Sequence, residues 1–210
     1  MSESLYAERN GFTSPNHRIS SIIRETLNKT DNRILFNIFQ AEIYRIQELF
    51  NEVEKTNRKI LIIGKKLETI ITKAIEMDYI KIDSKKLGNI SNVNDENTVL
   101  LISDEREKPY SNINRIVRGY DKLIKIKATD TIIFAAPVYE GLEKSATKIF
   151  DNISKVGANL VEISSKKYAE HHASSEDIML MLDLMSPKYF MPVIGDFKQM
   201  VASKESAKKA

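Results

Sequence analysis

Five short, largely apolar runs recur along this sequence, and they limit the folds that it can adopt more than any other feature does. Each run is apolar at consecutive positions, which is typical of parallel strands covered on both faces. The runs span residues 33–39, 59–64, 98–103, 131–137 and 159–164. A further run at residues 189–195 predicts a sixth strand near the end of the chain.

Patterns with helical spacing separate these runs. Leu67, Ile71 and Ala74 recur three or four positions apart, and so do other apolar residues between the runs. Strands that alternate with amphipathic helices predict an α/β fold with a mostly parallel sheet of about five to six strands flanked by helices. The sequence also predicts a short strand at residues 79–83 and a helix that starts at Ser14-Pro15.

At 210 residues the chain is long enough to bury a sizeable core, and we interpret it as one domain with trailing ends. Residues 1–13 are expected to form an extended lead-in with no core of their own. The domain would then cover residues 14–201. Residues 202–210 would form a tail that either extends the last helix or is disordered.

The composition excludes several classes of protein. Because the sequence has no cysteine, it can form neither a disulfide framework nor a zinc site with cysteine ligands. The net charge of +3 permits contact with a polyanion without arguing for one. No apolar run approaches the roughly 20 residues that a membrane span needs, and the first residues do not resemble a signal peptide. We therefore expect a cytoplasmic protein with no membrane contact.

In sheets of this type, ligands bind at the carboxyl ends of the strands. Gly64, Lys65 and Lys66 follow one strand there, but the spacing of a phosphate-binding loop is absent. We interpret Gly64 as a turn residue followed by solvated lysines. The loops at this edge are expected to begin near Gln40, Gly64, Ser103, Pro137, Ser164 and Gly195.

Two of the three histidines are adjacent, at His171 and His172, before a helix whose start shows the capping-box spacing of Ser174 and Asp177. Neighbouring side chains in an extended segment point in opposite directions, so one metal ion cannot easily bind both imidazoles. From the residues alone, His172 is either a structural or solvated histidine, or a functional one in a loop at a strand end.

Two motifs around this helix resemble a known family. His172-Ala173-Ser174 opens the helix, and residues 187–193 read Pro-Lys-Tyr-Phe-Met-Pro-Val. Both resemble the β-CASP domain of ribonuclease J, a bacterial nuclease built on a metallo-β-lactamase fold. The resemblance extends over nearly the whole chain and includes Arg45-Ile46-Gln47 and Glu143-Lys144-Ser145.

The resemblance implies an RNA-binding role for this domain. It places His172 at a position that contacts an RNA phosphate near the metals, with Ser174 in the same phosphate-binding motif. Arg45 would order or contact the edge of the site, and Lys65 would supply a positive charge to the RNA backbone. The full-length family is a metal-dependent 5′–3′ exo- and endoribonuclease that uses zinc or manganese. Single-stranded RNA is therefore the expected partner.

Several positions depart from the family. Ile194 stands where the family has a metal-binding histidine, and an isoleucine cannot bind zinc or manganese. The charged segment 104–109 replaces a glycine-rich one, Glu170 replaces a serine of the phosphate pocket, and Glu3 aligns loosely with a bridging aspartate. The His-x-His-x-Asp-His motif of the metal centre is also absent from the sequence. We therefore expect no catalytic residue, metal ligand or cofactor in this chain, which would be a β-CASP fragment unable to hydrolyse RNA alone.

Two alternatives remain. The domain could be a non-catalytic assembly subunit of an active ribonuclease, either as a homo-oligomer or in a complex with a ribonuclease J paralogue. The substitutions at Ile194 and in residues 104–109 favour this role, since they would remove catalytic activity without preventing folding. A nucleotide-binding doubly wound enzyme is a more distant alternative, and it rests on fold analogy alone.

Overall fold

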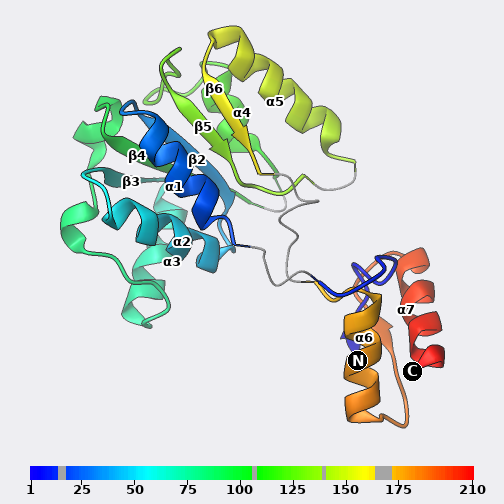
Figure 1. Ribbon diagram of the computed structural model, residues 1–210. Coiled ribbons are helices and arrows are strands. Elements are labelled where there is room, and N and C mark those ends of the chain that lie inside the picture. Colours follow the sequence, from blue (N-terminus) through cyan, green and yellow to red (C-terminus); the bar gives the residue numbers. More distant parts are fainter. Residues whose placement is uncertain (14–17, 106–107, 139–140, 164–171) are drawn as a thin grey trace. The chain divides into compact units, whose positions relative to one another are not determined.

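The computed structural model describes residues 1–13, 18–105, 108–138, 141–163 and 172–210. The chain divides into two compact units (Figure 1). Arg18–Ser165 contains the large sheet and is called the sheet unit below. The two ends of the chain, Met1–His17 and Lys166–Ala210, together form the second unit, called the terminal unit.

The sheet unit is built on five parallel strands. They are β2 (Ile34–Phe39), β3 (Lys59–Ile63), β4 (Thr98–Asp104), β5 (Thr131–Phe134) and β6 (Asn159–Glu162). Their order in the sheet is β3-β4-β2-β5-β6, and every neighbouring pair is parallel. The central strand β2 is buried at each of its positions, as expected for a strand covered on both faces. The predicted α/β fold with a parallel sheet is therefore confirmed.

Helices cover both faces of this sheet. They are α1 (Ser20–Lys29), α2 (Ile43–Glu54), α3 (Lys65–Glu76), α4 (Ser111–Val117) and α5 (Glu143–Val156), with short 3-10 helices η1 (Ser84–Lys86) and η2 (Ile90–Asn94). Leu35 and Phe134 of the strands share one apolar cluster with Ile113 of α4 and Ile149 of α5. α1 and α2 pack together on the opposite face (Figure 1). No helix formed by the described residues is long and apolar enough to cross a membrane.

Two local predictions for this unit have different outcomes. The predicted strand at residues 79–83 is wrong: Tyr79 is exposed, and Ile80 is the one buried residue of the segment, which leaves too little apolar surface to join a sheet. The predicted helix start at Ser14-Pro15 lies outside the described residues, and α1 is described from Ser20.

The terminal unit joins residues from opposite ends of the chain. β1 (Ser2–Glu3) and β7 (Pro192–Val193) form a two-stranded parallel sheet, and α6 (Ser175–Met185) and α7 (Phe197–Lys209) complete the unit. Ala7 is buried with Ile178 and Leu182 of α6 in a small apolar core. This small core belongs to the terminal unit.

For these end segments, two expectations are wrong and one open alternative is decided. The run at 189–195 is not a sixth strand of the large sheet, because its described strand pairs with β1. Residues 1–13 do have a core, since they supply β1 and the buried Ala7. Residues 202–209 belong to α7, which is the helical one of the two alternatives. These outcomes depend on contacts between distant segments, which no local pattern reveals. The domain boundaries themselves stay a prediction.

Candidate functional site

At the carboxyl edge of the sheet, the connections that leave the neighbouring strands β2 and β5 run in opposite directions. From β2 the chain crosses to β3 on one side, whereas from β5 it continues to β6 on the other. In open parallel sheets, ligands usually bind in the crevice between strands whose connections diverge in this way. The residues that follow β2 and β5 are therefore the expected position of a ligand in this unit.

Arg45, which the resemblance places at the edge of the site, is buried here. Its side chain is 3% exposed, and Nη1 lies 3.1 Å from Glu42 Oε2. The same nitrogen donates to the carbonyl oxygen of Ala135 at 3.2 Å. Gln47 instead hydrogen-bonds the backbone of Lys81, at 2.7 and 2.9 Å. Arg45 thus ties α2 to the end of β5, while Gln47 holds the segment after α3.

A buried polar pair that the motifs did not reveal lies at the same edge. Asp104 is 1% exposed, and its carboxylate accepts hydrogen bonds from Asn112 N at 2.6 Å and from Asn37 Nδ2 at 3.0 Å. Burial raises the pKa of the Asp104 carboxyl, although these hydrogen bonds act in the opposite direction. Asn37 Oδ1 is buried and has no hydrogen-bond partner in the described part of the chain. A single asparagine inside an apolar strand was the sequence signal for this pair.

Lys65 and Lys66 begin α3 directly after Gly64. Gly64 has a φ of 107°, a conformation that strains any residue with a side chain, so it is the turn residue that the sequence indicates. Lys65 is exposed, whereas Lys66 Nζ pairs with Glu105 Oε2 at 2.9 Å. The negative charge of Glu105 is therefore paired with a lysine. Residues 106–107 of the same segment lie outside the described residues.

In the terminal unit, His172 lies against Glu3. Its Nδ1 is 2.9 and 3.0 Å from the two carboxylate oxygens, and its ring meets Tyr6 edge to face, with centroids 5.0 Å apart. The guanidinium of Arg9 lies 3.4 Å from the centre of the Tyr6 ring. The His172 side chain is 19% exposed and is held by residues from the start of the chain. The other predicted positions here, residues 170–171, lie outside the described residues.

Ser174 lies in a fixed turn at the start of α6. The backbone N–H groups of Ser174 and Thr13 both donate to Asp177 Oδ2, at 3.0 and 2.9 Å, and Thr13 Oγ1 donates to the carbonyl oxygen of His172 at 2.7 Å. Burial by itself would raise the pKa of the Asp177 carboxyl, but hydrogen bonds from Thr13 and Ser174 outweigh it and lower the pKa. The predicted capping pair therefore also anchors the backbone of His172.

Ile194 follows β7, and its side chain is 63% exposed. Its carbonyl oxygen accepts the N–H of Ser4 at 3.0 Å, so Ile194 lies beside the segment that carries Glu3 and contacts His172. Isoleucine offers no donor atom to a metal, and Glu3 and His172 are bonded to each other. Within the described ranges, no three His, Cys, Asp or Glu side chains are grouped to hold a metal ion. These residues therefore do not fit a metal centre.

Comparison with known proteins covers both units. The sequence model described as "Ribonuclease J, beta-CASP domain" matches residues 31–153, which is more than half of the chain. Ribonuclease J from Mycoplasma genitalium is 31% identical over 212 residues, which cover 99% of this chain and 37% of the relative. Ribonuclease J2 from Bacillus subtilis (strain 168) is 26% identical over 212 residues, which cover 100% of this chain and 38% of the relative.

The chain thus spans less than two fifths of the length of the curated relatives that it matches. The matched range 31–153 contains β2 to β5 and most of α5, and the relatives align with the terminal unit as well. The family model, the parallel sheet and the motifs around His172 and residues 187–193 agree. The chain therefore belongs to the β-CASP domain family of ribonuclease J.

Proposed function

We propose that this chain is the part of an RNA-processing and RNA-decay nuclease that holds single-stranded RNA. Its membership of the ribonuclease J β-CASP family carries the proposal. Because the described residues do not group into a metal site, the zinc or manganese centre of such a nuclease would be formed by residues other than these. A cytoplasmic location stays a prediction.

His172 would contact an RNA phosphate at the β1–β7 pair. Glu3 fixes the orientation of the imidazole ring through Nδ1, and the turn of Thr13, Ser174 and Asp177 fixes its backbone. This double restraint supports a role for His172 in positioning a ligand, because a rigidly held group loses little conformational freedom on binding. Ser174 would act through the turn that holds His172.

Arg45 and Lys65 would have different parts in the sheet unit. The Arg45 guanidinium is buried against Ala135 and Glu42, so it would order the edge of the sheet rather than touch RNA. Lys65 is exposed at the carboxyl end of β3, where its charge would attract the RNA backbone without reading its sequence.

Titration of the purified chain with a 5′-monophosphorylated single-stranded oligonucleotide tests the proposal. We expect binding that weakens as salt is raised, and a loss of most of that binding in His172→Ala. The chain alone should not cleave the oligonucleotide with zinc or manganese added. The proposal would be wrong if the chain bound no RNA, or if the purified chain cleaved RNA in a metal-dependent way.

A second candidate is an assembly role in a complex with a catalytically complete ribonuclease J paralogue. The terminal unit favours this role because it leaves large apolar side chains exposed, namely Leu184, Met185, Tyr189, Ile194 and Phe197. Analytical ultracentrifugation of the two proteins tests it. A stable complex whose nuclease activity is unchanged by His172→Ala would favour assembly over RNA binding at His172, and no complex would exclude it.

A further inference from the structure

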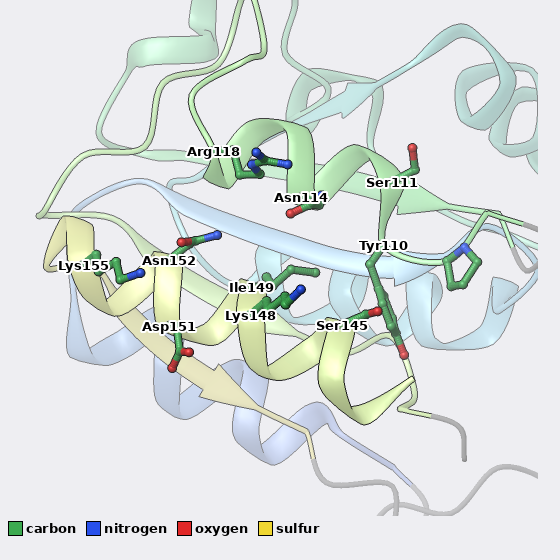
Figure 2. A pocket seen from close by; sticks show the side chains of 11 residues that line it. Tyr110, Ser111, Asn114, Arg118, Ser145, Lys148, Ile149, Asp151, Asn152 and Lys155 are labelled. Carbon is green, nitrogen blue, oxygen red and sulfur yellow. The ribbon is translucent and has the colours of Figure 1, made fainter. Parts of the chain in front are cut away.

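A polar groove runs between α4 and α5 in the sheet unit (Figure 2). Its volume is about 560 Å³. Asn114 of α4 and Arg118, which caps the C-terminal end of α4, line the groove together with Lys148, Asn152 and Lys155 of α5. On each helix these residues are three, four or seven positions apart, so each helix presents one continuous stripe to the groove. The restraints around His172 and the motif at residues 187–193 do not involve this surface, although Pro109 and Ser145 of the family segments also line it.

The charges in the groove suit an anion. Arg118, Lys148 and Lys155 are exposed cations, and the side-chain amides of Asn114 and Asn152 add neutral hydrogen-bond donors. Among the described residues, no carboxylate forms an ion pair with Lys148 or with Lys155.

One acidic residue, Asp151, also lines the groove. Figure 2 shows its carboxylate pointing away from α4, on the side of α5 that is farther from Arg118 and Asn114. The side chains that face one another across the groove are therefore cationic or neutral.

An exposed aromatic ring lies beside the Arg118 end of the groove. Tyr120 is 66% exposed, and Arg118 Cζ lies 4.8 Å from the centre of its ring. Arg118 Nη2 is also 3.3 Å from Tyr120 Oη. A cationic groove next to an accessible aromatic ring is the combination that holds single-stranded nucleic acid, because phosphates meet the cations and a base stacks on the ring. A free phosphate would use the cations alone.

We propose that the groove between α4 and α5 binds the phosphate backbone of single-stranded RNA, with a base stacked on Tyr120. The inference rests on the proposed function of holding RNA, and it adds a second contact surface to that of His172. The stripe from Ser111 to Arg118 is roughly 10 Å long at the rise of an α-helix. The lysines of α5 line the groove opposite this stripe and would bind successive phosphates.

Binding to the 5′-monophosphorylated oligonucleotide at several salt concentrations tests this inference. Lys148→Gln with Lys155→Gln should weaken binding about tenfold or more and reduce the salt slope by about 1.4, because each lost phosphate contact removes roughly 0.7. Lys73→Gln with Lys85→Gln removes the same charge from exposed positions of α3 and η1 and should change binding little. Tyr120→Ala should weaken binding of the oligonucleotide roughly tenfold. It should not change binding of inorganic phosphate.

Each outcome separates this inference from the proposed function. If the two double variants weaken binding equally, net charge alone explains the effect and the groove is not a site. If His172→Ala abolishes binding and the groove variant does not, the proposed function stands and the groove inference falls. If inorganic phosphate binds as tightly as the oligonucleotide and Tyr120→Ala changes neither, the groove holds a phosphate rather than RNA. Both ideas fall if the wild-type chain binds no RNA.

Discussion

At the end of β4, the Asp104 carboxylate is buried away from water. It accepts hydrogen bonds from backbone N–H groups of α4 and from the side-chain amide of Asn37. Burial has the larger effect, so the pKa of Asp104 is raised and the folded state binds a proton there more tightly than the unfolded chain does. The stability that protonated Asp104 contributes is therefore complete below its ordinary pKa of 3.8, and it is lost as the pH rises through the raised value.

We expect Asp104→Asn to be tolerated better than Asp104→Ala. An asparagine keeps an oxygen for Asn112 N, and its amide can donate to Asn37 Oδ1 once the Asn37 amide turns over. Alanine leaves buried donors unpaired, which should cost about 1–3 kcal/mol of the free energy of unfolding. Urea denaturation at neutral pH measures both variants. An alanine variant as stable as the wild type would mean that this buried network contributes nothing.

At the scale of elements, α1 and α2 are joined by a carboxylate with two cationic partners. Glu52 on α2 accepts hydrogen bonds from Arg24 of α1 at 2.9 Å and from Lys55 at 2.8 Å. The hydrogen bond from Arg24 is the main cause of a Glu52 pKa of about 2. One turn earlier on α2, Glu48 accepts the backbone N–H of Ile19 at 2.7 Å. The start of α1 is therefore capped by α2.

Acid should weaken this helix pair through Glu52. Because its folded pKa is lowered, its contribution is complete above the ordinary value of 4.5 and is lost as the pH falls towards about 2. We expect a loss of about 1–2 kcal/mol over that range, less than the shift alone implies, since Arg24 and Lys55 are more than half exposed and solvent screens them.

Urea denaturation of wild type and Glu52→Gln over this pH range measures the effect. Glutamine does not titrate, so the stability of the variant should depend less on pH between about 4.5 and about 2. Equal losses in both proteins would exclude Glu52 as the cause.

At the scale of the whole molecule, the two ends of the chain form one unit and its middle forms the other. The family match at residues 31–153 falls within the sheet unit. The motifs at His172 and at residues 187–193 lie in the terminal unit. Both units therefore carry features of the ribonuclease J family, and each supplies one of the proposed RNA contacts.

Deletion of residues 1–13 should unfold α6 and α7 and leave the sheet unit folded. The deleted segment supplies β1, the buried Ala7 and the hydrogen bond from Thr13 to Asp177. In two-dimensional NMR spectra, the amide signals of residues 175–209 should move to random-coil chemical shifts. The amide signals of β2 to β6 should stay dispersed. Ala7→Asp, which puts a charge into the small core, should produce the same pattern in the full-length chain. Unchanged resonances from α6 and α7 would show that this unit does not need the start of the chain.

Much of the sheet unit could be predicted from local sequence. A strand covered on both faces is apolar at consecutive positions, so the runs that became β2 to β6 were visible by themselves. The spacing of Ser174 and Asp177 predicted the start of α6 for a similarly local reason. The same reasoning failed for residues 189–195, because an apolar run does not reveal which strand it pairs with.

The sequence by itself determined the α/β class, the strands of the large sheet and the resemblance to ribonuclease J, because each depends on residues near one another in the chain. Only the tertiary structure decided that Glu3 meets His172 across 169 positions and that β1 pairs with β7. It also decided that Arg45 and Asp104 are buried, and that α4 and α5 leave a cationic groove between them. A side chain's partners and exposure depend on how distant segments pack, and periodicity in the sequence does not record that packing.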